Sequence, residues 1–488
     1  MYKKLLIILF IAVCCFLILK TIDGARPVSE DIAVYALLAQ SLVSGQGYSD
    51  LCYSGNPVHT KYPFVLPLIL MPLITNFGYN FLIMRLLMFL FAVGIIIFSY
   101  VLFRRQSSGL PELVVLFVAF SSWFLYYTYN LAIDIPYLFF SLAALYYLDK
   151  YFKHSTQVGL YLSFIFIVLA FYTKVTGIAL IAALAVYAAV HRKYVKLNKV
   201  IILLASVSLV CALWFIRSKY LESSNSGVFN SYSKEFFAVT DFFTYEKHDG
   251  SLLGTLKIVV KNIYALMFYA FPQCLTGLTI DKRNYLAVIP GIIVLMGFIK
   301  AVKQKIGIIE IYFITYIAML MLWAAFAKAG TRYIVGILPF VFYYFLTGIN
   351  MIVWNKRKIA ASICALFITV NAILSFNYAF RQNKVNNSEF LTMCGWIKDN
   401  TPENAVFASE SMQYWLYMYS GRKSALQIPV TRDTSLVYDI IKSNNIKYLT
   451  VSPEFMLSYD VIEPVIRKNA NKFKAVYNTN GNIVYKVL

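Results

Sequence analysis

Apolar stretches, each about long enough to cross a lipid bilayer as a helix, recur along most of this chain. In a membrane such stretches fold as helices, because every backbone hydrogen bond must be made within the segment. The stretch at 157–190 fits either two short helices or one long bent helix. The pattern predicts an all-α membrane bundle of about eleven transmembrane helices, at about 5–22, 78–103, 110–128, 132–149, 157–173, 175–190, 200–217, 285–302, 306–327, 333–353 and 359–378.

The composition supports a membrane protein and argues against nucleic acid as a partner. Of 488 residues, 60% are hydrophobic and only 14% are charged, whereas a soluble globular protein has about 25% charged residues. A formal net charge of +21 would suggest nucleic-acid binding in a soluble chain. Here the basic residues lie mostly in short clusters between apolar runs, as they do in loops that face anionic lipid. We therefore expect membrane lipids, and no nucleic acid, as partners.

The basic clusters predict the orientation of the chain. Loops rich in Lys and Arg stay in the cytoplasm, and the spans given above place every basic cluster on one side. The N-terminus is therefore predicted to be cytoplasmic and the C-terminal tail extracytoplasmic. The clusters are Lys3-Lys4, Arg104-Arg105, Lys150 with Lys153, Arg192 to Lys199, Lys300 to Lys305, and Lys356 to Lys358.

Three long segments fall on the predicted outer side, at 23–77, 218–284 and from 379 onward. In the first, Ser29 can cap a helix that begins at Glu30, and its apolar stripe predicts a helix lying along the membrane surface. The tail alternates helix and strand patterns and carries Asn480-Gly481 as a hairpin turn. We expect a transmembrane domain at 1–378 and a small α/β domain at 379–488.

Ionisable residues near the outer surface are the first candidates for chemistry, because burying a charge in a membrane is costly unless it is paired or functional. Each also has a structural explanation. An acid at a helix start meets the favourable helix dipole, and Lys174 or Arg332 could extend to the membrane interface. His59 lies near Lys61 and could join such a site. The candidates on this side are Glu30, Asp31, Lys61, Tyr62, Asp134, Lys174, Arg332 and Tyr333.

At these residues the chain resembles the GT-C superfamily of membrane glycosyltransferases, especially the branch of the lipid A aminoarabinose transferases and the protein O-mannosyltransferases. Five motifs carry the likeness, all in order and on the predicted outer side, and together they cover most of the chain. The order Glu30-Asp31 departs from the Asp-Glu of some relatives, so both carboxylates are candidates. The motifs are Ser29 to Leu42 for the acidic loop helix, Lys61-Tyr62-Pro63 for the loop end, Asp134 to Phe140, Tyr172 to Lys174, and Arg332-Tyr333 with Pro339 downstream.

The resemblance implies transfer of a hexosyl or pentosyl group from a polyprenyl-phosphate donor to a lipid, glycan or protein acceptor outside the cytoplasm. The departing phosphate needs positive charge, and the acceptor needs a base. Asp31 is the favoured base, because it shares a helical face with Tyr35. A divalent metal, if used, would sit on carboxylates. The expected catalytic residues are Asp31, Glu30 and Asp134, and the expected substrate-binding residues are Tyr35, Lys61, Tyr62, Lys174, Arg332 and Tyr333.

Three other classes of protein remain as alternatives at this stage. A transporter or lipid flippase would explain the spans and some intramembrane charge. It would not explain paired acids on a loop helix or an α/β tail. A polysaccharide polymerase or ligase is chemically close but would usually lack this order of motifs, and a non-catalytic assembly subunit has no need of them. The sequence specifies neither the sugar nor the acceptor.

Overall fold

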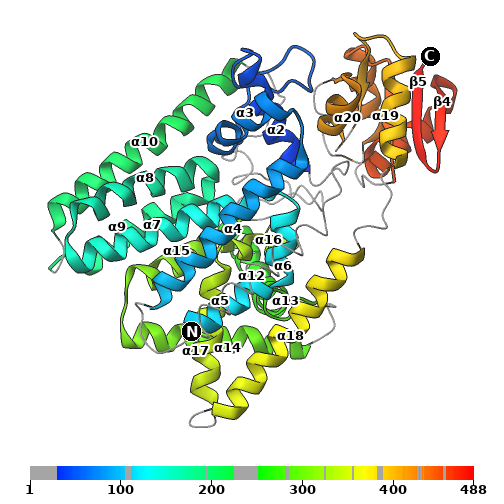
Figure 1. Ribbon diagram of the computed structural model, residues 1–488. Helices are drawn as coiled ribbons and strands as arrows, with labels where there is room; N and C mark the ends of the chain where they lie inside the picture. The colour runs from blue at the N-terminus through cyan, green and yellow to red at the C-terminus, as the bar shows by residue number, and fades with distance from the viewer. Residues whose placement is uncertain are drawn as a thin grey trace.

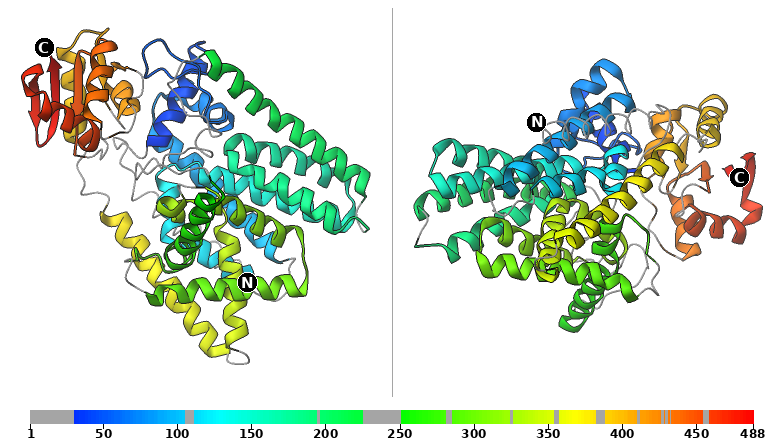
Figure 2. Two further views of the ribbon diagram at one scale, coloured as in Figure 1. Left: turned by 180° about the vertical axis from the view of Figure 1, so that it is seen from behind. Right: turned by 60° about the horizontal axis from the view of Figure 1, so that its bottom comes forward.

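The computed structural model describes residues 30–104, 111–193, 196–224, 251–280, 285–323, 326–353, 357–381, 388–409, 412–425, 428, 431, 433–453 and 458–488. A body of helices occupies most of the molecule, and a small domain with a β-sheet lies at one end of it, next to α2 and α3 (Figure 1). The same arrangement is visible from behind and from below (Figure 2). The expected first span, 5–22, lies outside the described residues.

Among the described residues, five helices are long and apolar enough to cross a membrane. Two further pairs of helices are apolar and long enough only when each pair is taken together. The first is α5 (Pro111–Phe120) with α6 (Ser122–Tyr129), and the two helices are bent by 54°. The second is α16 (Phe326–Val335) with α17 (Leu338–Ile352), which are bent by 88° at a break after Val335. The five are α4 (Phe81–Arg104), α10 (Leu197–Ser224), the stretch Leu252–Thr276 that contains α12 (Leu252–Ala265) and α13 (Phe271–Thr276), α14 (Val288–Gln304) with its preceding turn, and α18 (Arg357–Arg381).

The expected count of about eleven spans is therefore not confirmed, since five helices qualify, or up to seven with the bent pairs. The reason is physical: a window of hydropathy counts apolar residues and does not detect where a helix breaks. Several apolar runs form helices of 10–17 residues. Residues 157–190, left open by the sequence, form two helices. The shorter apolar helices include α3 (Val65–Phe77), α8 (Gln157–Thr173), α9 (Ile178–Val190) and α15 (Ile308–Met321).

The expected outer segment 218–284 contains the stretch Leu252–Thr276, which is itself a candidate span. How much of this segment lies outside the membrane stays a prediction. The stretch begins with Ser251, whose hydroxyl accepts the backbone N–H of Gly254 as a helix cap. Its middle is a short π-helical turn, Leu266–Ala270, and such turns are often found near functional sites.

The loop helix α2 (Glu30–Val43) forms where expected, and most of it is surrounded by protein. Every residue from Ile32 to Ala39 is at most 2% exposed. The sequence of this stretch is apolar on all sides, and a helix that is hydrophobic all round is buried. It packs against α3 on one side and α20 (Gln413–Ser420) of the C-terminal domain on another.

The C-terminal domain has the α/β character that the sequence predicts. Its five strands lie in the order β2-β1-β3-β5-β4, parallel between β2, β1 and β3 and antiparallel beyond. Asn480 and Gly481 have φ of 48° and 83°, as the expected hairpin turn requires. The elements are α19 (Ser388–Asn400), β1 (Val406–Ala408), α20, β2 (Lys423–Ser424), α21 (Thr434–Ser443), β3 (Tyr448–Val451), α22 (Glu463–Lys468), β4 (Phe473–Thr479) and β5 (Asn482–Val487).

The first loop extends the sheet of this domain at the edge strand β2. The N–H of Ser424 donates to the carbonyl of Cys52 at 2.8 Å, and the N–H of Ser54 donates to the carbonyl of Ser424 at 2.9 Å. Tyr53 bridges Ser424 as a parallel β-partner, and the amide of Gln413 on α20 donates to its hydroxyl at 3.2 Å. The tail and the first loop are therefore one packed unit.

Candidate functional site

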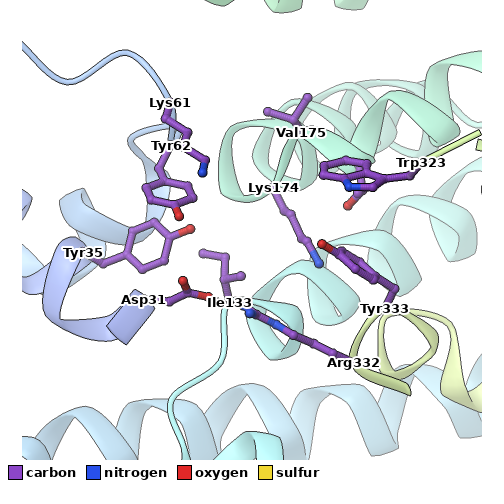
Figure 3. A pocket seen from close by; sticks show the side chains of 11 residues that line it. Asp31, Tyr35, Lys61, Tyr62, Ile133, Lys174, Val175, Trp323, Arg332 and Tyr333 are labelled. Carbon is purple, nitrogen blue, oxygen red and sulfur yellow. Dashed lines mark hydrogen bonds and ion pairs between the residues drawn. The ribbon is translucent and has the colours of Figure 1, made fainter. Parts of the chain in front are cut away.

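A pocket opens where the starts of α2 and α7 (Asp134–His154), the break between α8 and α9, and α16 approach one another. Asp31, Tyr35, Lys61 and Tyr62 face Lys174, Trp323 and Tyr333 across the pocket, and Arg332 reaches toward Asp31 (Figure 3). Seven of the nine predicted site residues line it. The eighth, Asp134, binds two of them from behind, and the side chain of Glu30 lies outside the described part of the structure. The lining residues are Asp31, Tyr35, Lys61, Tyr62, Ile133, Lys174, Val175, Thr176, Trp323, Arg332 and Tyr333.

Four of these charged side chains form an alternating row at the pocket. Arg332 Nη2 donates to Asp31 Oδ2, while Arg332 Nε donates to Asp134 Oδ2 at 3.1 Å. Lys174 Nζ donates to the other oxygen, Asp134 Oδ1, at 2.5 Å. Two carboxylates thus meet two cations, which offsets the cost of removing each charge from water.

Exposure separates the two carboxylates of this row. The side chain of Asp134 is fully buried and that of Lys174 is 9% exposed, whereas Asp31 and Arg332 are 24% and 33% exposed. Each carboxylate oxygen of Asp134 accepts a hydrogen bond from one cation, so Asp134 orients Lys174 and Arg332. Asp31 is the carboxylate within reach of a molecule that enters the pocket.

Local backbone features bring these residues together. Asp134 is the first residue of α7, where a negative charge is favoured by the helix dipole. Lys174 follows the end of α8 in an extended conformation, with φ −146° and ψ 129°, which turns its side chain out of the helical path. Arg332 lies in the last turn of α16, and the neighbouring Thr331 hydroxyl donates to Gln273 Oε1 on α13 at 2.5 Å. The stretch Leu252–Thr276 therefore helps to hold Arg332.

Aromatic rings cover both sides of the pocket. On one side the rings of Tyr35 and Tyr62 lie 5.2 Å apart, and Lys61 Nζ lies 5.3 Å from the centre of the Tyr62 ring. On the other, the rings of Tyr333 and Trp323 are 5.7 Å apart. Rings next to hydroxyls and cations suit a ligand with both a sugar and a phosphate.

Sequence analysis missed four of the lining residues, Trp323, Ile133, Val175 and Thr176. A Trp at the end of an apolar run is the ordinary sign of a membrane interface, so nothing marked Trp323 as a pocket residue. A residue distant in the sequence holds Trp323, because the side-chain amide of Asn262 on α12 donates to the backbone carbonyl of Trp323 at 2.8 Å. The other three are adjacent in the sequence: Ile133 precedes Asp134, and Val175 and Thr176 follow Lys174. They could have been found only by extending those two motifs.

The described side chains do not form a fitting metal site. Among them, no three His, Cys, Asp or Glu groups come together. Asp31 and Asp134 both bind Arg332, and Lys174 holds Asp134 as well. A metal ion at these carboxylates would have to displace cationic donors. The side chain of Glu30, the remaining acid considered for a metal, lies outside the described part.

Comparison with known proteins agrees with the motifs seen in the sequence. A family model described as dolichyl-phosphate-mannose-protein mannosyltransferase matches residues 61–216, a region that includes Lys61, Tyr62, Asp134 and Lys174. A comparison with curated protein sequences found no match.

Solved structures of three membrane proteins share the fold. One is the archaeal oligosaccharyltransferase AglB from Archaeoglobus fulgidus, in complex with an inhibitory peptide and a dolichol-phosphate: the TM-score is 0.59 at 12% identity, over 99% of this chain and 74% of that one. Another is ArnT from Cupriavidus metallidurans bound to undecaprenyl phosphate, with a TM-score of 0.51 at 14% identity, over 98% and 97%. The arabinofuranosyltransferase AftD from Mycobacteria gives 0.53 at 11%, over 99% and 40%. The chain therefore has the fold that these three structures share, and residues 61–216 match the mannosyltransferase family model.

Proposed function

We propose that this protein transfers a sugar from a polyprenyl-phosphate-linked donor to an acceptor on the outer side of the membrane. The single observation that carries the proposal is the row Asp31–Arg332–Asp134–Lys174 at an aromatic pocket. Asp31 is within reach of a ligand and pairs with Arg332, so a base and a cation for a departing phosphate lie side by side. The match to the mannosyltransferase family model and the lipid phosphates bound to AglB and ArnT support the same donor class.

The cations serve the leaving group. When the bond between the anomeric carbon and the phosphate oxygen breaks, the electron pair stays on the phosphate, whose charge grows in the transition state. Lys61, Lys174 and Arg332 all line the pocket and supply fixed positive charge to that phosphate. A phosphate that leaves with such neutralisation needs no strong acid to protonate it.

Asp31 serves the acceptor. The acceptor hydroxyl or amine attacks the anomeric carbon and gives its proton to Asp31 as the new bond forms. Before the donor binds, Asp31 is held by Arg332. The donor phosphate competes for this guanidinium, because a phosphate binds it at least as well as a carboxylate does. Arrival of the donor thus releases Asp31 to act as a base, while Asp134 keeps Arg332 and Lys174 in place.

The transferred group is a hexosyl or a pentosyl unit, and the acceptor is a lipid, a glycan or a protein. The test incubates protein purified in detergent with polyprenyl phosphates that carry one or the other sugar, together with lipid, glycan or protein fractions that supply the acceptor. We expect release of free polyprenyl phosphate that depends on Asp31 and Arg332. Donor movement across a vesicle membrane without cleavage would overturn the proposal in favour of a flippase. Glycolipids and glycoproteins that disappear from a deletion strain would then identify the acceptor.

A further inference from the structure

Behind the pocket, the first loop contains a buried pair of titratable side chains that the proposed chemistry does not use. His59 and Asp50 are each 2% exposed, and His59 Nδ1 lies 2.8 Å from Asp50 Oδ2. The two residues are held opposite each other, since the N–H of His59 donates to the carbonyl of Tyr48 and the N–H of Asp50 donates to the carbonyl of Pro57. Among the described residues, His59 does not line the pocket. If His59 belongs to the site, as the sequence suggests, it must act through a residue that does line the pocket.

The second ring nitrogen of His59 points to the pocket segment. The backbone N–H of Tyr62 donates to His59 Nε2 at 2.8 Å. A backbone N–H can only donate, so Nε2 must carry no proton, and Nδ1–H is then the donor to Asp50. Asp50 thus fixes the tautomer of His59 that can accept from Tyr62. The same relay of carboxylate, imidazole and acceptor orients histidines in many sites.

The Tyr62 segment is also held from its other side. The hydroxyl of Tyr48 donates to the carbonyls of Tyr62 and Pro63, at 2.9 and 3.1 Å. Burial and the nearby Asp50 carboxylate raise the pKa of this hydroxyl well above its ordinary value, so it remains a donor. The ring of His59 stacks on that of Tyr62 at 5.3 Å, with 19° between the planes. Tyr62 is therefore fixed by both backbone groups and by its ring.

This clamp sets the position of two residues that line the pocket. Lys61 and Tyr62 have no secondary structure to hold them, because α3 begins only at Val65. The Tyr62 ring lies against that of Tyr35, and Lys61 Nζ lies over the Tyr62 ring. A shift of the Tyr62 backbone would move both side chains relative to Arg332 and Lys174.

We propose that His59, oriented by Asp50, is a positioning residue that holds Lys61 and Tyr62 in place for the donor phosphate. The inference rests on the proposed function for its kinetic consequence. Its structural part, the bond from Tyr62 N–H to His59 Nε2, can be measured without any activity. His59 touches neither donor nor acceptor and takes no part in proton transfer.

The matched variants are His59→Asn and His59→Gln. Both place a side-chain amide at this position, but the Gln side chain is one methylene group longer. The Asn amide ends near the position of Nδ1 and can still bind Asp50, whereas the Gln amide ends near that of Nε2 and can accept from Tyr62. Ser218→Ala is the control, because the Ser218 hydroxyl donates at 2.9 Å to the carbonyl of Thr60 in the same loop, which is not the bond under test. Each variant removes or changes one buried hydrogen bond to this loop.

The first measurement is hydrogen–deuterium exchange of the Tyr62 amide in the intact protein. Loss of one buried hydrogen bond should speed this exchange by about 10- to 100-fold in His59→Asn. Exchange should stay near the wild-type rate in His59→Gln and in Ser218→Ala. Equal exchange in His59→Asn and wild type would overturn the clamp, whatever the protein's activity.

The second measurement is the kinetics of sugar transfer at varied donor concentration. A positioning role raises the donor KM in His59→Asn by about tenfold, equivalent to one weakened contact to phosphate, and His59→Gln restores it. A residue that only supports folding would lower the amount of active protein and leave KM unchanged. Faster Tyr62 exchange with an unchanged donor KM would therefore overturn the positioning role. Absence of transfer in wild type would refute the proposed function, while the exchange result would still decide the clamp.

Discussion

At the scale of single residues, the two carboxylates of the pocket differ in their surroundings and so in what they can do. Asp134 is buried and gives one oxygen each to Lys174 and Arg332. Asp31 is partly exposed and forms an ion pair with Arg332. A base must be reachable by the acceptor, and an orienting group must not move. From these surroundings we propose the first role for Asp31 and the second for Asp134.

Replacement of Asp31 by Asn should slow turnover by about 10²- to 10⁴-fold, the usual contribution of a positioned base. Donor affinity should stay the same or rise, because Arg332 no longer has Asp31 as a competing partner. Sugar transfer and donor binding by the purified variant would be measured together. Glu30→Gln is the matched control and should lose much less. Collapse of turnover in Glu30→Gln with near-normal Asp31→Asn would move the role to Glu30.

Replacement of Lys174 by Met should reduce both stability and activity. It removes a charge-assisted contact to the donor phosphate, which typically costs about 1.5–3 kcal/mol, or roughly ten- to a hundredfold in donor binding. It also leaves the buried Asp134 carboxylate with Arg332 alone. The double variant Asp134→Asn with Lys174→Met should regain thermal stability, because no half-paired buried charge remains, yet it should stay inactive. A double variant with normal transfer would show that neither residue serves the donor.

Transfer should persist when divalent cations are removed. Arg332 and Lys174 already neutralise Asp31 and Asp134, so the charge that a metal would bring is present in the side chains. The measurement compares initial rates in chelator with rates after Mg²⁺, Mn²⁺ or Zn²⁺ is added back. Full loss of transfer in chelator, restored by one of these ions, would place a metal at the site after all.

At the scale of elements, the first loop and the C-terminal domain depend on each other. Leu37, Cys52 and Tyr53 form a small buried cluster against aromatic residues of α20. β2 pairs with the loop at Tyr53, and Lys423 Nζ donates to Asn56 Oδ1 at 2.7 Å. The first loop, which also carries Lys61 and Tyr62, thus packs against the tail near Tyr53, although the two segments are far apart in the sequence.

Truncation of the chain after Arg381 should loosen the first loop while the helical body keeps its fold. Without α20 and β2, the buried faces of α2 and of the loop become exposed to solvent. Hydrogen–deuterium exchange should rise across residues 30–60 and remain unchanged across α14, which contacts helices of the body. Unchanged exchange across 30–60 would show that the loop folds without the tail, as a separate α/β unit would allow.

At the scale of the whole molecule, the site lies near the ends of many helices and close to the C-terminal domain. α7, α8 and α16 contribute the charged row, and α2 brings Asp31 from the first loop. The positive-inside pattern of the sequence predicts that this end of the bundle is extracytoplasmic. The side of the membrane on which each segment lies stays a prediction.

That orientation can be tested with single cysteines at exposed positions in a background without the seven native cysteines. Gln157 at the start of α8 is predicted to be cytoplasmic, and Glu403 in the C-terminal domain is predicted to be outside. An impermeant thiol reagent added to intact cells should label Glu403→Cys and leave Gln157→Cys unlabelled until the cells are opened. The reverse pattern would invert the topology and place the site in the cytoplasm.

The sequence by itself predicted a helical membrane protein, a small α/β domain at the C-terminal end, and seven of the eleven residues that line the pocket. These features depend on local signals: apolar runs, turn residues such as Asn480-Gly481, and charged side chains at helix starts. Five short motifs in order were enough to group residues that lie up to 301 positions apart, as Asp31 and Arg332 do.

Only the tertiary structure decided how many helices are continuous, which carboxylate is buried, and what covers the loop helix. A bend such as that after Val335, or the break at Lys174, depends on packing and does not change the hydropathy of the run. Burial of Asp134 and of the His59–Asp50 pair depends on partners from distant segments, which no local pattern encodes. For the same reason only the structure shows what covers α2: its apolar faces pack against α3 and against α20, an element far along the chain.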